Sequence, residues 1–501
     1  MFGPCTPEEL SALGSACEQA GYSEQGLLEL FGPVGLPLRP TREMARFRHL
    51  TRQNRALDTL ARLFLLGLPV SQAAALRALD AELLESCLRW GLLERHGEDV
   101  CATVRLLPYR GLLLAADQAE RPEIALRADQ VMGITASTAA LADFTVRQPA
   151  RATLDLGTGC GVQAFLAARH SGEVVATDTN PRALEFACFN ARLNNITNVC
   201  FIQGDGFQPV LGRRFDLVVV NPPFAISPAA RYLYRDSGLP GDSFCQRLVR
   251  EAPGFLHEGG FFQMTLDWAE YAGQDWRGRL AEWFQDSGCD AWVLRLDRHA
   301  PAAYAYMWVH DTEPDHLESA GRLFDEWVSY FEREGIEAVS TGLIALRRSP
   351  RARHWLRIEE GPEQVVGRIG PWVLQGFLLQ DFLDDTDDAA LLDHKLRLSP
   401  DVRLTEECQA GEGRWRATAT RIRLRRGLLW EGNLDSRLSG LLARLDGRRP
   451  LRDLLVHLAV ELGVEPERLI PKCLPLLRDL IQRGFLLPEH FPAAAQQDEA
   501  Q

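Results

Sequence analysis

Between residues 129 and 313, short apolar runs rich in β-branched residues alternate with stretches of helical periodicity. Strands separated by helices are typical of βαβ units and a mostly parallel sheet. The first four runs carry apolar residues on both faces, as a sheet covered by helices on both sides requires. We therefore expect a doubly wound, seven-stranded Rossmann-like α/β domain over residues 129–313, with strands at ATLDL, EVVATD, VCFIQ, FDLVVV, GFFQMTL, AWVLRL and AYMWVH.

Helical spacing dominates the chain before this domain. Thr6-Pro7-Glu8-Glu9 is a good helix start, and apolar residues recur at helical spacing through ALDTLARLFLLG, VSQAAALRAL and DAELLESCLRWGLLE. Two strand-like runs follow, VCATVRLLPY and RGLLLAAD. Helices followed by a hairpin are the order of a winged helix, so residues 1–128 are expected to form an N-terminal helical, winged-helix-like domain. It is either a nucleic-acid reader or a helical platform packed on the next domain.

The C-terminal part of the chain divides into two further segments. Residues 314–400 are expected to form an α+β extension, whose acidic stretch DFLDDTDDAALLD is interpreted as solvated surface. A strand-like run, RWRATATRIRLRRGLLW, then precedes two helical stretches. Residues 401–501 are accordingly predicted to be a C-terminal winged-helix-like module.

Charge changes this picture in two places. The 501-residue chain has a net charge of −13, which argues against a protein that coats nucleic acid non-specifically. Yet residues 39–55 hold six Arg against one Glu, and residues 414–426 hold six Arg and no acidic residue. A strand written R-I-R-L-R-R would display Arg along one face. These clusters either position the phosphates of an RNA or pair with the chain's own carboxylates.

Cysteine spacing and apolar run length exclude several classes of protein. The eleven cysteines include no C-x-x-C pair and no Cys/His cluster at ligand spacing, so neither a disulfide framework nor a metal site is expected. The start, MFGPCTPEEL, lacks the pattern of a signal peptide, and no apolar run reaches about 18 residues. We expect a cytoplasmic protein that does not span a membrane.

The strongest local signal for chemistry is LDLGTGCGVQAFLAA, residues 154–168. A strand runs into Gly157, Gly159 and Gly161 and then into a helix, so the backbone can approach a ligand and the helix offers free N–H groups. Dinucleotide-binding proteins and methyltransferases share this feature. Asp178 ends the second strand, where a carboxylate can accept both ribose hydroxyls. Asp205, after the third strand, is placed to meet an exocyclic amine.

The fourth strand ends abruptly in Asn221-Pro222-Pro223-Phe224. This point lies beside the first strand, where open α/β sheets bind ligands. A planar amino or amide nitrogen is a poor nucleophile because its lone pair is delocalised. The Asn221 side-chain oxygen and the Pro222 carbonyl can each accept one of its N–H bonds, which aims the lone pair at a methyl donor. Phe224 can stack on the planar group, and the two prolines restrict the turn.

Taken in order, these features resemble the class I S-adenosylmethionine-dependent methyltransferases, and the resemblance covers residues 129–313. Within that class they are similar to small-domain enzymes that act on the guanine N2 of ribosomal RNA or on a release-factor glutamine. The resemblance implies that S-adenosylmethionine is the cofactor, that Asp155 and the Gly157–Gly161 loop hold its methionine part, Asp178 its ribose and Asp205 its adenine. The expected cofactor-binding residues are Asp155, Gly157, Thr158, Gly159, Gly161, Asp178, Asp205, Gly206, Phe207 and Asn221; the expected catalytic residues are Asn221, Pro222, Pro223 and Phe224.

Three neighbouring segments are similar to parts of the same enzymes. Residues 129–144 precede the first strand where a covering segment is expected, and Ser137 and Thr138 there could cap a helix. Asn190 and Asn194, in FNARLN, match a common Asn-Ala segment but could equally be surface residues of a helix. The loop SPAARYLYRDSGLPGDSF is expected to be a lid over the acceptor or a plain surface loop.

The acceptor itself is left open by these residues, because the same motif serves nucleobase amino groups and glutamine amides. Within the resemblance, Phe at position 224 favours the enzymes that act on ribosomal RNA guanine. A macromolecular acceptor is therefore expected, with a nucleobase of ribosomal or transfer RNA favoured over protein. Three alternatives stay open: a protein glutamine N-methyltransferase of the release-factor type, a small-molecule N-methyltransferase, and a non-catalytic cofactor-binding protein.

Overall fold

The computed structural model describes residues 2–32, 43–118, 126–312, 317–362, 364–411 and 413–491. The chain forms two compact units, Met1–Ala142 with Pro149–Glu359, and Asp143–Gln148 with Glu360–Gln501. No helix among the described residues is long and apolar enough to cross a membrane. Of the N-terminal arginine cluster, Arg39 and Arg42 lie outside the described residues.

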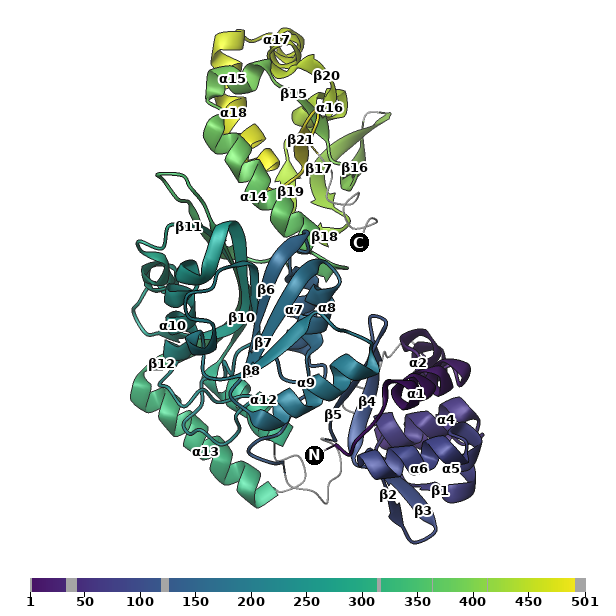
Figure 1. The fold of residues 1–501 in the computed structure, drawn as a ribbon. Coiled ribbons are helices and arrows are strands. Elements are labelled where there is room, and N and C mark those ends of the chain that lie inside the picture. Colours follow the sequence, from purple (N-terminus) through teal and green to yellow (C-terminus); the bar gives the residue numbers. More distant parts are fainter. Residues whose placement is uncertain are drawn as a thin grey trace. The chain divides into compact units, whose positions relative to one another are not determined.

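An eight-stranded sheet forms the centre of the first unit, in the order β13-β11-β12-β10-β9-β6-β7-β8 (Figure 1). Strands β6 to β10 pair in parallel, whereas β12 is antiparallel to both β10 and β11. The predicted doubly wound α/β fold is confirmed, and β13 adds an eighth strand at one edge. The strands are β6 (Ala150–Leu156), β7 (Ser171–Asp178), β8 (Val199–Gln203), β9 (Phe215–Val220), β10 (Leu256–Tyr271), β11 (Cys289–His299), β12 (Ile336–Arg348) and β13 (Leu356–Glu360).

Two elements near the end of this sheet differ from the prediction. The run AYMWVH, expected to be a strand, lies in helix α12, whose residues Tyr304, Ala305 and Val309 are buried at helical spacing, whereas Tyr306 and Met307 of the run are exposed. The sheet instead takes β12, so it extends past residue 313, the limit expected from the sequence. The helices of this part are α7 (Ala136–Phe144), α8 (Val162–Ala168), α9 (Pro181–Leu193), α10 (Ser243–Glu251), α11 (Trp276–Ala281), α12 (Pro301–Thr312) and α13 (Leu317–Glu334).

The N-terminal part of the first unit is largely helical, with a small antiparallel sheet in the order β1-β3-β2 and a separate hairpin of β4 and β5. Thr6 caps the first helix through a reciprocal pair of hydrogen bonds with Glu9, as its sequence predicts. The elements are α1 (Pro7–Gln19), α2 (Glu24–Phe31), α3 (Met44–Leu50), α4 (Ala56–Leu60) continued by η2 (Ala61–Leu65), β1 (Val70–Ser71), α5 (Gln72–Ala78), α6 (Ala81–Trp90), β2 (Leu93–His96), β3 (Asp99–Ala102), β4 (Val104–Tyr109) and β5 (Leu112–Asp117).

Helix α6 has the place in this order that a nucleic-acid-reading helix takes in a winged helix. Its exposed face carries Glu82 and Glu85, and Glu85 pairs with Arg95 of β2. Its Arg89 pairs with Glu9 of helix α1. Glu85 and Arg89 of this helix are thus paired within the protein. The winged-helix assignment and the alternative of a helical platform both stay predictions.

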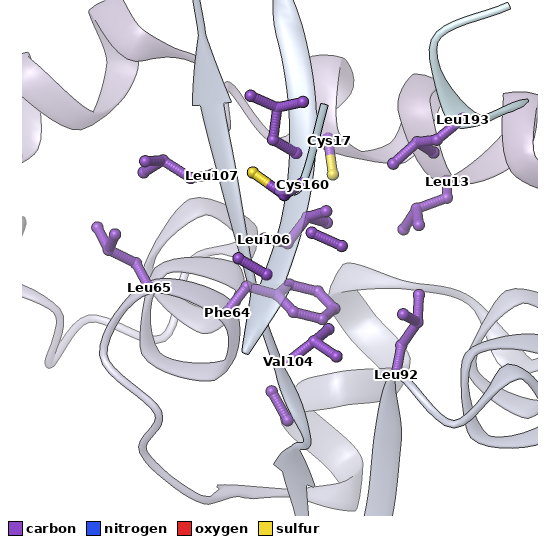
Figure 2. Close-up of a cluster of buried hydrophobic side chains, with 14 of the residues drawn as sticks. Leu13, Cys17, Phe64, Leu65, Leu92, Val104, Leu106, Leu107, Cys160 and Leu193 are labelled. Carbon is purple, nitrogen blue, oxygen red and sulfur yellow. The ribbon is translucent and has the colours of Figure 1, made fainter. Parts of the chain in front are cut away.

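The N-terminal part and the α/β domain share one hydrophobic core. Leu13, Phe64 and Leu106 from the N-terminal part pack in the same buried cluster as Cys160 and Leu193 from the α/β domain (Figure 2). At its margin, the Phe2 ring stacks on Phe189 with 4.3 Å between ring centroids. Burial of apolar surface between the two parts makes them one folded unit.

Two asparagines of helix α9 bind the hairpin strand β5 to the α/β domain. The Asn190 amide accepts from the N–H of Ala115 and donates to its carbonyl, both at 2.8 Å. One turn later, Asn194 makes the same pair of bonds with Leu113, at 2.8 and 2.9 Å. The two side-chain amides thus pair with backbone groups of β5 that a neighbouring strand would otherwise bind. The FNARLN segment has a structural role here, and Asn190 is fully buried.

In its described residues, the second unit combines small sheets with five helices. Its three-stranded sheets have the orders β16-β17-β19 and β20-β15-β21, and β14 pairs with β18. Four aspartates of the acidic stretch, Asp384, Asp385, Asp387 and Asp388, are exposed, as expected of solvated surface. The elements are β14 (Val365–Val366), α14 (Gly370–Asp385), α15 (Asp388–Asp393), β15 (Lys395–Leu398), β16 (Val402–Gly411), β17 (Arg414–Leu424), β18 (Gly427–Leu428), β19 (Glu431–Leu434), α16 (Ser436–Arg444), β20 (Asp446–Pro450), α17 (Leu451–Leu462), α18 (Pro466–Gln482) and β21 (Leu486–Pro488).

Candidate active site

The glycine loop joins β6 to α8 at the carboxyl ends of the parallel strands. Gly159 has φ +55°, and a Cβ built there would meet nothing within 4 Å, so the loop leaves open space over this residue. Gly161 has φ +97°, and its Cβ would lie 2.3 Å from the Phe165 ring. Glycine is therefore required at position 161 by both backbone and packing. The N–H groups of Gly157 and Thr158 both donate to the Thr177 carbonyl of β7, at 2.8 Å each.

Asp155 braces this loop from inside the sheet. Its Oδ2 atom accepts from Thr158 Oγ1 at 2.7 Å and from the Ala164 N–H at 2.9 Å. The carboxylate is 2% exposed, and this burial raises its pKa to about 7 against the lowering effect of the two donors. The Asp155 and Thr158 side chains thus hold the strand, the loop and the first turn of α8 together.

Asp178 ends β7 and faces the loop. Its Oδ2 accepts from the Gly159 N–H and its Oδ1 from the Asn180 N–H, both at 2.9 Å. Burial raises the pKa of this carboxyl, and the backbone donors of Asn180, Gly159 and Thr179 oppose the rise. Each oxygen has a second lone pair, so the carboxylate can still accept from two hydroxyls of a ligand.

Asp205, Gly206 and Phe207 follow β8 and are placed differently from one another. Asp205 is exposed, and its Oδ2 lies 3.3 Å from an Arg247 guanidinium nitrogen, which is a loose ion pair. Gly206 adopts φ +51°. The Phe207 ring is 2% exposed and stacks on Phe255 with 4.3 Å between centroids. The structure therefore places that ring in the core, and only the backbone of Phe207 is left to face a ligand.

The Asn-Pro-Pro-Phe motif lies directly beside the glycine loop. Leu156 and Val220 are paired at the ends of the neighbouring strands β6 and β9. A Cβ built on Gly157 would lie 3.9 Å from the Asn221 carbonyl oxygen. The Phe224 ring is half-buried and makes an edge contact with Trp308 of α12, with centroids 6.4 Å apart. The structure thus brings together the two features that the sequence separates by about sixty residues.

Asn221 is held by side chains from two other elements. Thr265 of β10 donates its hydroxyl to Asn221 Oδ1 at 2.8 Å. On the other side, Asn221 Nδ2 lies 3.4 Å from both Ser137 Oγ and Thr138 Oγ1 of α7. The sequence did not single out Thr265; its only signal is a lone hydroxyl in the buried run FFQMTL. Ser137 and Thr138 were expected to cap a helix, and that cap is instead Thr135, whose Oγ1 accepts from the Thr138 N–H at 3.2 Å.

A buried network supports the chain just after the motif. The Ile226 N–H donates to Tyr304 Oη at 3.2 Å, and Tyr304 donates to Asp267 Oδ2 at 2.6 Å. Tyr304 is fully buried, and burial raises the pKa of Asp267 to about 7. The loop beyond, expected to be a lid or a surface loop, contains a buried ion pair between the neighbouring residues Arg235 and Asp236 at 2.7 Å.

The segment before α7 lies over the β7–α9 turn, next to Asp178. The Asn180 side chain donates to the Asp129 carbonyl at 2.9 Å. Arg182 forms a bidentate ion pair with Asp117, both bonds at 2.7 Å, and the same carboxylate accepts from the Val131 N–H at 2.8 Å. The structure therefore places residues 129–131 at the edge of the candidate cofactor site. Among the described residues, no group of three or more His, Cys, Asp or Glu is arranged to hold a metal ion.

Comparison with known proteins identifies the middle of the chain. Residues 133–270, which include the glycine loop, Asp178, Asp205 and the motif, match the methyltransferase small domain family. Residues 19–103 and 375–488 match two domains of unknown function, DUF7059 and DUF7782.

Two curated relatives match about a quarter of the chain each. A release factor glutamine methyltransferase of Xylella fastidiosa is 34% identical over 134 residues, 24% of this chain and 49% of the relative. A putative protein N5-glutamine methyltransferase of Methanocaldococcus jannaschii is 32% identical over 119 residues, 22% of this chain and 59% of the relative. The chain thus spans about half the length of the relatives it matches.

The crystal structure of Trm5b from Pyrococcus abyssi is 14% identical and has a TM-score of 0.30, with 51% of this chain and 62% of that chain covered. A TM-score this low supports no conclusion about function. The names of the curated relatives give no support to RNA over protein as the acceptor, so the preference for RNA drawn from Phe224 stays a prediction. From its sequence matches and its fold, the chain contains a class I S-adenosylmethionine-dependent methyltransferase domain.

Proposed function

We propose that the protein is an S-adenosylmethionine-dependent N-methyltransferase that acts on the side-chain amide of a glutamine in a protein. The observation that carries this proposal is the placement of Asn221 at the end of β9, beside the glycine loop, with its side-chain oxygen oriented by Thr265. The names of the curated relatives support the side-chain amide nitrogen of a glutamine as the planar nitrogen that accepts the methyl group.

The residues of the glycine loop side fit the expected cofactor. The open space over Gly159 suits the methionine part of the cofactor, because a Cβ at this position would extend into the same space. Asp178 retains acceptor capacity for two ribose hydroxyls, and exposed Asp205 can reach an adenine amine. When bound, S-adenosylmethionine supplies an electrophilic methyl group on its sulfonium. The protein's own residues then have to bind the acceptor nitrogen and orient its lone pair.

Asn221 and Pro222 can perform that orientation. An amide oxygen accepts two hydrogen bonds, and Thr265 uses one at Asn221 Oδ1, so the other lone pair is left for an acceptor N–H. The Pro222 carbonyl accepts no hydrogen bond from the described residues, so it can take the second N–H. Phe224 is half-buried and offers its face to the planar group. The rate then comes from orientation, and the methylated nitrogen releases one proton to water.

An RNA nucleobase is the second candidate, favoured by a single observation, the row of exposed arginines on β17. The names of the relatives speak against it. Both candidates use the same four motif residues. The choice between them has to be made by identifying the molecule that receives the methyl group.

The test is a methyl-transfer assay with labelled S-adenosylmethionine, offering peptide release factors, ribosomal subunits and total RNA from a strain that lacks the gene. We expect label in a protein, with mass spectrometry placing it on a glutamine. Asn221→Ala should lose transfer by about 100-fold or more, because it removes the side chain that orients the acceptor. Calorimetry should show that cofactor binding is largely kept, because the Asn221 backbone carbonyl beside the glycine loop stays in place. Gln53→Ala, which removes an exposed amide far from the motif in sequence, is the matched control.

Label recovered only in RNA would refute the glutamine acceptor and favour the second candidate. Full activity of Asn221→Ala would refute the planar-nitrogen mechanism altogether. A wild-type protein that does not bind S-adenosylmethionine would refute the cofactor assignment.

A further inference from the structure

Three hydroxyl side chains meet at the start of helix α7, next to Asn221. Thr135 Oγ1 lies 2.9 Å from Ser137 Oγ and 2.8 Å from Thr138 Oγ1. The same Thr135 oxygen accepts from the Thr138 N–H at 3.2 Å. Ser137 Oγ and Thr138 Oγ1 each lie 3.4 Å from Asn221 Nδ2, so the three hydroxyls and the amide close a ring. We call Thr135, Ser137 and Thr138 the hydroxyl triad.

The hydroxyl triad is tied to the helix that follows the glycine loop. Gln163, in the first turn of α8, donates its side-chain Nε2–H to the Thr138 carbonyl at 2.9 Å. Thr138 and Gln163 are both buried, so water competes little for these bonds. The triad therefore has a fixed position between the glycine loop and Asn221.

The two ends of the Asn221 side chain have opposite hydrogen-bonding character, although they are similar in size. The oxygen Oδ1 accepts, the nitrogen Nδ2 donates, and a half-turn about the Cβ–Cγ bond exchanges them. Only the oxygen can accept an N–H of the methyl acceptor. Thr265 holds the amide at one end, but its hydroxyl can donate to an oxygen or accept from a nitrogen. Thr265 alone therefore does not choose which end faces the acceptor.

The hydrogens of the triad make that choice. Thr135 has one hydroxyl hydrogen, so it can donate to only one of its two hydroxyl neighbours, and the other neighbour must donate to Thr135. That neighbour has no hydrogen left and can face Asn221 only as an acceptor. With Nδ2 on this side every bond of the ring can form, whereas with Oδ1 there one contact sets lone pair against lone pair.

We infer that the hydroxyl triad positions Asn221 by holding Nδ2 on the α7 side, which leaves Oδ1 for the acceptor N–H. Thr135 is thus a positioning residue that acts through Ser137 and Thr138. The loss of one hydrogen bond corresponds to a preference of about 10-fold for this orientation. The inference rests on the proposed function for its effect on methyl transfer, whereas the orientation itself can be measured without an acceptor.

The test compares Thr135→Val with the wild type by nuclear magnetic resonance of the full-length protein, with isotope labels on asparagine amides and threonine methyl groups. Asn221→Ala identifies the Asn221 amide signal among the eight asparagines, and Thr138→Ser and Thr265→Ser identify the two methyl signals. In the wild type, the Asn221 amide hydrogens should show a nuclear Overhauser effect mainly to the Thr138 methyl group. In Thr135→Val both neighbouring hydroxyls are free to donate to Oδ1, so about half of this effect should move to the Thr265 methyl group.

The same variant should also lose methyl transfer to a peptide release factor. We expect kcat to fall at least about 2-fold, because half of the molecules present the wrong end of the amide, with an unchanged dissociation constant for S-adenosylmethionine. Thr135→Ser keeps the hydroxyl and should restore both measurements. The matched control is Thr6→Val, which removes the capping hydroxyl of α1 in the same way and should change neither. Thermal melting verifies that all variants are folded.

An unchanged ratio of the two Overhauser effects in Thr135→Val would overturn the inference, even if kcat fell, because the loss would then come from damage to helix α7. Failure of Thr135→Ser to restore the wild-type ratio would overturn it as well. If the ratio shifts as expected but no glutamine is methylated, the positioning of Asn221 stands and only the proposed function fails.

Discussion

The cofactor side and the acceptor side of the candidate site are held together in different ways. On the cofactor side, the glycine loop and Asp178 are fixed by backbone groups of two adjacent strands, as in the bond from the Gly159 N–H to Asp178, 19 residues away. On the acceptor side, Asn221 is fixed by the Thr265 hydroxyl, 44 residues on, and Ile226 by Tyr304, 78 residues on. The first arrangement depends on local chain geometry and the second on side chains brought from distant elements.

Substitution of Asn190 should have the largest effect, because this residue of the cofactor side also depends on a distant element. Its side chain joins the glycine loop to the hairpin strand β5. Its side chain donates to the Cys160 carbonyl in the loop at 2.9 Å and bonds both backbone groups of Ala115. Asn190→Ala should lower the free energy of unfolding by about 4 kcal/mol, since three buried polar groups lose their partner. Denaturant titration measures this, with Cys188→Ala at an exposed position of the same helix as control. A loss below about 1 kcal/mol would show that the loop is independent of the hairpin.

Asp178 tests the cofactor side by itself. Asp178→Ala should weaken S-adenosylmethionine binding by about 100-fold, because it removes two hydroxyl acceptors and the partner of the Gly159 N–H. Asp205→Ala should cost only several-fold, because that carboxylate is exposed. Isothermal calorimetry measures both dissociation constants. If the two substitutions had equal effects, the ribose would not depend on a preorganised carboxylate.

On the acceptor side, the buried Asp267 makes stability depend on pH. Its folded-state pKa is raised to about 7 from 3.8, so the folded protein holds an extra proton between these values and loses stability as pH rises through that window. Asp267→Asn does not titrate and keeps an oxygen for Tyr304. Its unfolding free energy relative to wild type should therefore rise by about 2.7 kcal/mol between pH 5 and pH 8, at about 1.36 kcal/mol for each of the two pH units below 7. Asp325→Asn makes the same change at an exposed site. A difference that did not vary with pH would place the ionised carboxylate in the folded state.

Thr265 should show the smallest effect and the most specific one. Thr265→Val keeps the shape of the side chain and removes the hydroxyl that orients Asn221. If the proposed function holds, kcat should fall by about 10-fold, with an unchanged dissociation constant for S-adenosylmethionine. Thr265→Ser should restore most of the rate. A fall in cofactor affinity with unchanged kcat would show that Thr265 serves the other half of the site.

The same contrast decides how much could be predicted from the sequence. The parallel strands, the glycine loop and the position of Asp178 follow from local patterns, and the structure places them together as those patterns predict. Thr265 and the Tyr304–Asp267 pair have no local sequence signature. A single polar residue within a buried strand gives no indication of whether its side chain has a functional partner. The residues just after Tyr304, Ala305 to His310, were predicted to form a strand, and they lie instead in helix α12. Likewise, only the packing of Phe207 against Phe255 shows that this ring is not available to a ligand.

Cys160 gives the shared core a practical use as a chemical reporter. It lies within the glycine loop, is 2% exposed, and packs in the cluster that the N-terminal part and the α/β domain build together (Figure 2). Burial raises the pKa of its thiol to about 12, so an alkylating reagent can reach a reactive thiolate only when this contact opens. The rate of labelling at Cys160 therefore measures how often the N-terminal helical part separates from the glycine loop. Bound S-adenosylmethionine should lower that rate.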